Sequence, residues 1–259
     1  MEYLIYIFAG LGAGVVTGLA GLSAAVIITP LLVGACGWNG YDTVTIALAA
    51  DVLASLLTSY TYYKNGNIDL KQGIKVSLSA FAGSVLGSYL GYLFSLNSEY
   101  GLGYLVMILN IFLGIKFLRN PVTGQKGEAA SGDALWEKKR SIAAVAAGFL
   151  IGVECGFMGS GGGILMLSVF IIILKRPLKT AVGTSTMIMT LVALTGALSH
   201  VALGADLQLI PGITIITACL LGAVVSAKYA NRCDNKKLNR IVGVTLILLS
   251  IISLALGRR

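Results

Sequence analysis

Two glycine-rich stretches interrupt long apolar runs and form the first candidate site. Gly18–Ser23 divides the run from about Leu4 to Gly37, and Gly159–Gly163 divides a later one. A helix that breaks inside an apolar run exposes backbone N–H groups at the start of its second half, and these favour an anion. We therefore predict an anion-binding site made by Gly21, Leu22, Ser23, Gly159, Ser160, Gly161, Gly162 and Gly163. The alternative is that these glycines only permit a tight turn between two spans.

A run of three hydroxyl side chains forms a second candidate. Thr184, Ser185 and Thr186 follow Gly183 near the start of an apolar segment. Adjacent side chains point in different directions on a helix, so at most two of them face one pocket. They are candidate donors to an oxyanion. The alternative is that they bond to the backbone of their own helix.

Two acidic residues lie well inside apolar segments. Asp51 falls in the segment 43–63, and Glu154 lies five residues before the second glycine break. Ionisable residues inside a membrane are costly and are functional candidates by default. A carboxyl group there can take up and release protons, which suits proton coupling. The alternative is a structural acid, or one that faces a water-filled vestibule.

The sequence offers little for metal binding or hydrolysis. His200 is the single histidine, and we expect it at the membrane interface. The four cysteines are scattered without a CxxC pair, so we expect no metal site and no cofactor. Ser160 or Ser185 with His200 would be needed for an intramembrane hydrolase, but GSGGG is not a strand–turn–helix nucleophile elbow. We therefore predict that the chain is not an enzyme.

Composition places these residues in a membrane. Of 259 residues, 56% are hydrophobic and only 12% are charged, against about 25% charged residues in soluble domains. This excludes an ordinary soluble enzyme and a disordered chain, and it makes the lipid bilayer a partner. The net charge of +8 comes from short basic clusters between apolar runs, which are typical of orientation signals and not of nucleic-acid binding. The first residues have no basic region, so we do not interpret them as a signal peptide.

The fold that must position the candidates is all-α and polytopic. We predict about ten helical segments with glycine-rich broken or re-entrant helices. The expected organisation is a first membrane repeat at 1–119, a cytoplasmic linker at 120–140 and a second membrane repeat at 141–259. The expected segments are 4–18, 23–37, 43–63, 74–95, 102–119, 141–157, 164–176, 180–201, 212–230 and 239–256.

Spacing and charge indicate that the two repeats are inverted. Gly14, Gly18 and Gly21 match Gly152, Gly156 and Gly159 at one constant offset. The loops 38–42 and 96–101 are acidic, whereas their counterparts 175–179 and 228–240 are basic. An odd number of segments per copy gives this result and places the N-terminus outside. Inverted repeats are typical of transporters whose substrate lies between broken helices. A duplicated membrane scaffold without transport is the alternative.

Three motifs carry a resemblance to a known family. The chain resembles the TauE/SafE family of sulfite-exporter-like permeases in its glycine-rich breaks, in Val182-Gly-Thr-Ser-Thr186 and in Gly66-Asn-Ile-Asp69. The resemblance implies a secondary transporter in a prokaryotic inner membrane that moves small sulfur-containing anions, such as sulfite or sulfonates, with export as the expected direction. Transport of another small solute or a cation remains the alternative. The oligomeric state, the exact substrate and the coupling ion stay open.

Overall fold

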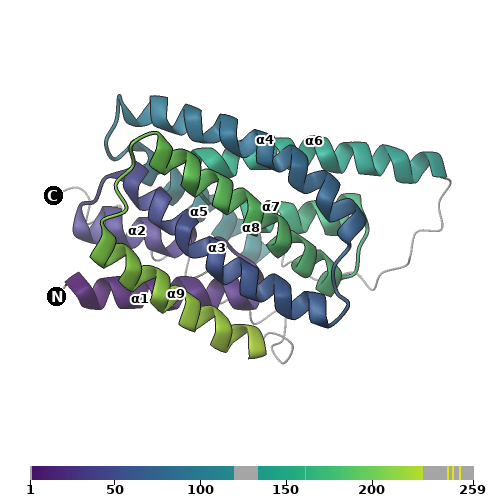
Figure 1. Ribbon diagram of the computed structural model, residues 1–259, viewed down its shortest axis with the longest axis horizontal. Coiled ribbons are helices and arrows are strands. Elements are labelled where there is room, and N and C mark those ends of the chain that lie inside the picture. Colours follow the sequence, from purple (N-terminus) through teal and green to yellow (C-terminus); the bar gives the residue numbers. More distant parts are fainter. Residues whose placement is uncertain are drawn as a thin grey trace.

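The computed structural model describes residues 2–119, 134–160 and 162–229, together with positions 244, 247 and 251. The secondary structure of the three long ranges is helical (Figure 1). The helices are α1 (Glu2–Ala20), α2 (Ala25–Cys36), α3 (Gly40–Lys64), α4 (Leu70–Ser95), α5 (Gly101–Arg119), α6 (Ala134–Met158), α7 (Gly162–Ser168), the π-helical η1 (Val169–Ile173), α8 (Leu178–Ala202) and α9 (Leu209–Tyr229).

These helices confirm an all-α polytopic membrane protein. Five of them, α3, α4, α6, α8 and α9, are long and apolar enough to cross a membrane. Each expected segment up to 212–230 corresponds to a helix, with bounds that differ by at most four residues except at the start of α6. The expected segment 239–256 lies outside the continuously described ranges. Helix α6 begins at Ala134, inside the range we assigned to the linker, whereas 120–133 is not described.

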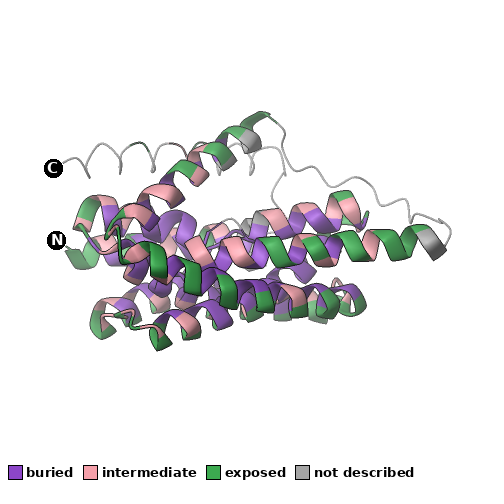
Figure 2. Ribbon diagram, turned by 90° about the horizontal axis from the view of Figure 1, so that it is seen from above, coloured by how far each residue is buried: buried purple, intermediate pink, exposed green. Residues whose placement is uncertain are grey.

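Helices α3 and α8 form the centre of the molecule. In their most apolar stretches 67% and 72% of the residues are buried, against 33% in α6 and 39% in α9. Figure 2 shows the buried residues gathered in the interior and the exposed ones on the outer helices. The two central helices are antiparallel, because Thr45 lies beside His200 and Ser55 lies beside Thr190. The offset that relates Gly21 to Gly159 also relates the bounds of α3 to those of α8, so equivalent helices run in opposite directions.

Glycines allow the outer helices to pack closely. Cβ atoms built on Gly83 and Gly87 of α4 would overlap backbone atoms of α6, and one built on Gly152 of α6 would overlap backbone atoms of α4. Gly14 of α1 lies in the same way against Cys219 of α9. Helix α1 therefore pairs with α9. The helices equivalent to these two are α6 and α4, and they also pair with each other. Each copy supplies one helix to each pair (Figure 1).

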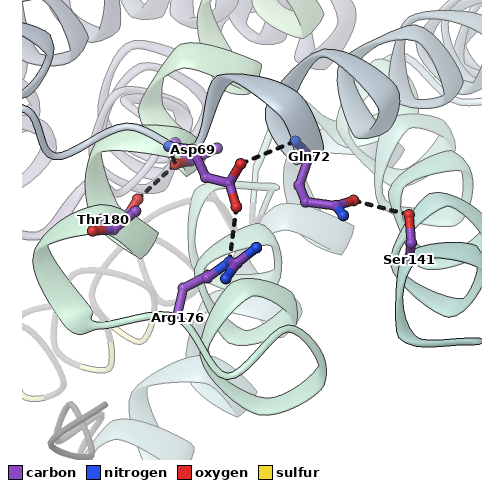
Figure 3. Close-up of polar contacts among 6 residues, drawn as sticks. Asp69, Gln72, Ser141, Arg176 and Thr180 are labelled. Carbon is purple, nitrogen blue, oxygen red and sulfur yellow. Dashed lines mark hydrogen bonds and ion pairs between the residues drawn. The ribbon is translucent and has the colours of Figure 1, made fainter. Parts of the chain in front are cut away.

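The two broken segments are helical hairpins. Helix α1 runs inward to the first break, and α2 returns, so that the rings of Tyr6 and Trp38 lie 5.6 Å apart at the same end. Helix α6 runs from the opposite end to the second break. The segment α7–η1 then returns to the end at which α6 begins, where Arg176 forms an ion pair with Asp69 at 2.8 Å (Figure 3).

Acidic and basic loops separate to opposite ends of the molecule. At one end the backbone N–H of Gly40 donates to the carbonyl of Glu99, and that of Asp206 donates to Asp42 Oδ1, both at 2.9 Å. At the other end the Asp69–Arg176 pair joins the α3–α4 turn to the end of the second hairpin (Figure 3). Equivalent loops of the two copies therefore differ in charge because they lie at opposite ends of the molecule.

Candidate functional site

The two helix breaks meet beside the middle of the long helix α3. The hydroxyl of Ser23 lies 2.6 Å from the carbonyl oxygen of Gly159, so the first break contacts the second directly. A Cβ atom on Gly163 would overlap the carbonyl oxygen of Gly21. The structure thus brings together the two stretches that the sequence singled out more than a hundred residues apart.

The backbone turns in the same way at both breaks. Gly21 has φ of +66° and Gly159 has φ of +69°, a left-handed conformation that side chains other than glycine rarely adopt. In each case the N–H of the glycine bonds to the carbonyl four residues earlier, from Thr17 and Cys155, respectively. The break therefore has one local cause in both copies: a glycine that ends the incoming helix in the left-handed conformation.

At the first break the carboxyl group of Asp51 covers the start of α2. Its Oδ1 accepts the backbone N–H of Ala24 at 2.6 Å, and its Oδ2 lies 2.5 Å from Ser23 Oγ. The side chain comes from α3 and is 1% exposed. The position that we predicted for an anion at this break is thus occupied by the side chain of Asp51. From the sequence alone, this acid and the anion site are separate features.

At the second break the equivalent position holds no acid. The offset between the two breaks relates Asp51 to Met189, whose sulfur would lie 3.0 Å from a Cβ atom on Gly162. Ser160 is fully buried, and its hydroxyl has no hydrogen-bond partner within the described part of the chain. Gly161 lies outside the described residues. Helix α7 continues directly as η1, so a single helical segment begins at Gly162.

The three hydroxyls near the start of α8 face different surroundings, as expected. Thr184 accepts the backbone N–H of Asp69 at 2.9 Å, which places it at the end of the molecule that carries the basic loops. Ser185 donates to the carbonyl of Val182. Thr186 lies at the breaks, since a Cβ atom on Gly21 would be 3.3 Å from its methyl group. Thr186 thus adjoins the meeting point, whereas Thr184 does not.

Two further side chains lie close to the second hairpin. Both carboxyl oxygens of Glu154 on α6 are shielded from solvent and lack a hydrogen-bond partner among the described residues. His200 was expected at the interface but is fully buried. Its Nε2 donates to the carbonyl of Gly156 at 2.8 Å, and its Nδ1 lies 3.0 Å from Thr45 Oγ1. The imidazole therefore joins α8 to the second hairpin and to α3, and not to Ser160 or Ser185. No sequence signal marked this role.

The sequence is similar to one described protein family and to two curated relatives. The sequence profile described as sulfite exporter TauE/SafE matches residues 6–253. The "Probable membrane transporter protein YunE" of Bacillus subtilis (strain 168) is 26% identical over 263 residues, with 96% of each chain covered. The "Probable membrane transporter protein YdhB" of the same organism is 25% identical over 219 residues, which cover 84% of this chain and 86% of the relative. No solved structure matches the chain.

Proposed function

The chain belongs to the sulfite exporter TauE/SafE family and is a multi-pass membrane transporter, and from that premise we propose that it exports small sulfur-containing oxyanions across the inner membrane. Sulfite and sulfonates are the substrate class. The family membership supports this choice of substrate and direction. The geometry of the second break supports an anion as the cargo.

The observation that carries the proposal is the difference in what covers the two breaks. The backbone at the start of α2 is covered by Asp51, whereas the start of α7 faces Met189, a neutral side chain. Unpaired N–H groups at a helix start attract anions. The hydroxyl of Ser160, which has no hydrogen-bond partner among the described residues, adds a donor. The substrate in our proposal lies at the second break, at Gly159–Gly163, with Thr186 at its edge.

In this proposal the first break, with Gly21, Leu22 and Ser23, supports the second. Ser23 reaches across to Gly159 and so couples the two hairpins. Because equivalent helices run in opposite directions, one copy can adopt the shape of the other, and their exchange opens the site to each side in turn. The two repeats of the proposal are 1–119 and 141–259. The end with the basic loops is cytoplasmic, which places the N-terminus outside.

Proton coupling through Asp51 or Glu154 completes the proposal. Ser23 has one hydroxyl proton but lies within hydrogen-bond distance of two oxygens, at Asp51 and Gly159. A proton on Asp51 Oδ2 would let the acid donate to Ser23, so that the serine proton is left for Gly159 alone. Glu154 has no described partner for either carboxyl oxygen. A change in the protonation state of either acid would alter the contacts or the charge beside the site.

Counterflow in proteoliposomes tests the substrate site. Vesicles with the purified full chain, loaded in turn with sulfite, a sulfonate and sulfate, should accumulate labelled sulfite only with a substrate inside. Met189→Asp puts a carboxyl group where Asp51 lies in the other copy, so it should reduce counterflow about tenfold or more, because an internal anion competes for the site. Met189→Leu conserves volume and is the matched control, expected to retain transport.

Two results would contradict this proposal. The first is an absence of oxyanion counterflow in vesicles that contain folded protein, and the second is Met189→Asp transport equal to that of Met189→Leu. Should Met189→Asp fail to fold, Gly162→Leu takes its place, and unchanged sulfite affinity in that variant would count against the site.

A pH series tests the coupling. Asn at position 51 can donate to Ser23 and accept from Ala24, so Asp51→Asn imitates a permanently protonated acid; Glu154→Gln does the same at its position. We expect at least one of the two to flatten the dependence of transport on pH between about 5 and 8. Coupling through these acids is wrong if both variants keep the wild-type pH profile in the same vesicles.

A further inference from the structure

A pocket lies between the first turns of α4 and α6, far from the helix breaks. Its volume is about 450 Å³. Three lysines line it, Lys71 and Lys75 from α4 and Lys138 from α6, together with a single acid, Glu137. The lining therefore carries a net positive charge, at the end of the molecule where the basic loops gather. Nothing in the proposed transport cycle uses these lysines.

The pocket changes from basic to apolar along the helices. Lys71, Lys75 and Leu78 follow one another on one face of α4, and Leu78 is 69% exposed. On α6 the same spacing leads from Lys138 to Ile142 and Val145, and Ile142 is 61% exposed. Both helices start at this end of the molecule, so the lysines lie at the mouth of the pocket and the apolar side chains lie deeper in the membrane.

The floor of the pocket is held in place by side-chain contacts. Ser141 of α6 donates to Gln72 Oε1 of α4 at 2.9 Å, and Asp69 accepts the N–H of Gln72 while it pairs with Arg176 (Figure 3). One turn away, Trp136 is exposed, and the centroid of its ring lies 5.6 Å from Lys139 Nζ. An exposed tryptophan beside a lysine is typical of the membrane–water interface. The pocket thus lies at the depth of lipid headgroups.

We propose that this pocket binds the headgroup of an anionic phospholipid, with an acyl chain along Leu78 and Ile142. The three lysines match a phosphate-bearing headgroup, since basic pockets between membrane helices bind such lipids. A soluble anion of the same charge would satisfy the lysines but would leave the exposed apolar side chains below them without a partner. The combination of charge and apolar length therefore favours a lipid over free phosphate.

Native mass spectrometry of the full chain in detergent tests the proposal. Phosphatidylglycerol and phosphatidylcholine with identical acyl chains are titrated separately, and glycerophosphoglycerol and inorganic phosphate are added as competitors without acyl chains. We expect the first phosphatidylglycerol to bind about tenfold more tightly than phosphatidylcholine. The triple variant Lys71→Gln, Lys75→Gln, Lys138→Gln should lose this preference.

A second triple variant provides the matched control. Lys64→Gln, Lys175→Gln, Lys179→Gln removes the same charge at the same end but outside the pocket lining, so it should keep the preference. Equal loss in both triple variants, equal binding of the two lipids, or complete displacement by free phosphate at the lipid's own concentration would each overturn the proposal. If the triple pocket variant does not fold, the single variants Lys71→Gln and Lys75→Gln replace it. Each of them should reduce the preference for phosphatidylglycerol a few-fold.

Discussion

The two helix breaks share one backbone and differ in what covers it. Gly21 and Gly159 have nearly the same positive φ and end their helices with the same hydrogen bond. Yet Asp51 covers the first break, and Met189 stands in the equivalent place at the second. An inverted repeat can therefore keep its backbone geometry, which alternating access requires, while side chains from the central helices make its two breaks chemically different.

The largest loss of stability is expected when the acid that distinguishes the first break, Asp51, is replaced. Asp51→Ala leaves the N–H of Ala24 and the hydroxyl of Ser23 without their acid partner and opens a small cavity, so we expect a loss of about 3 kcal/mol in the free energy of unfolding. Equilibrium unfolding in detergent measures it. Asp51→Asn conserves the shape and both hydrogen bonds, and it is expected to lose less than about 1 kcal/mol. Equal loss in the two variants would show that the carboxyl group itself, and not the shape or the hydrogen bonds that asparagine retains, holds the first break.

A smaller effect is expected where the two breaks cross. Gly163 and Ala25 hold equivalent positions, but a Cβ atom on Gly163 would overlap the carbonyl of Gly21, whereas Ala25 is accommodated. Gly163→Ala should therefore cost about 2 kcal/mol of unfolding free energy, because the hairpins must separate. Gly12→Ala is the control: its Cβ atom would meet Ile27 at an ordinary 3.6 Å, and the variant should be neutral or slightly stabilised. A Gly163→Ala protein as stable as Gly12→Ala would contradict the close crossing.

Much of the fold could be predicted from the sequence because its signals are local. Apolar length and polar punctuation located the helices, and glycine-rich stretches located the breaks. The direction of the repeats followed from loop charge, and the antiparallel pairing of Thr45 with His200 agrees with it.

The arrangement of the site could not be predicted in the same way, because it depends on contacts between distant segments. Sequence spacing gave no indication that Asp51 would reach the backbone at Ala24, or that His200 would be buried against Gly156. Helix periodicity limits which hydroxyls share a face, but it does not say which face meets the breaks. The structure separates Thr186, at the breaks, from Thr184, at the loop of Asp69.

The smallest change in stability is expected when one serine from each break is replaced. Ser23 bridges Asp51 and Gly159, so Ser23→Ala should cost about 1 kcal/mol of unfolding free energy. The hydroxyl of Ser160 has no described partner, so Ser160→Ala should leave stability within about 0.5 kcal/mol of wild type and weaken sulfite counterflow several-fold. Ser77→Ala on α4 removes another buried hydroxyl for which the described residues provide no partner, so it is the control and should change neither quantity. If Ser160→Ala instead loses stability with transport intact, the hydroxyl has a structural partner and the second break loses its proposed donor.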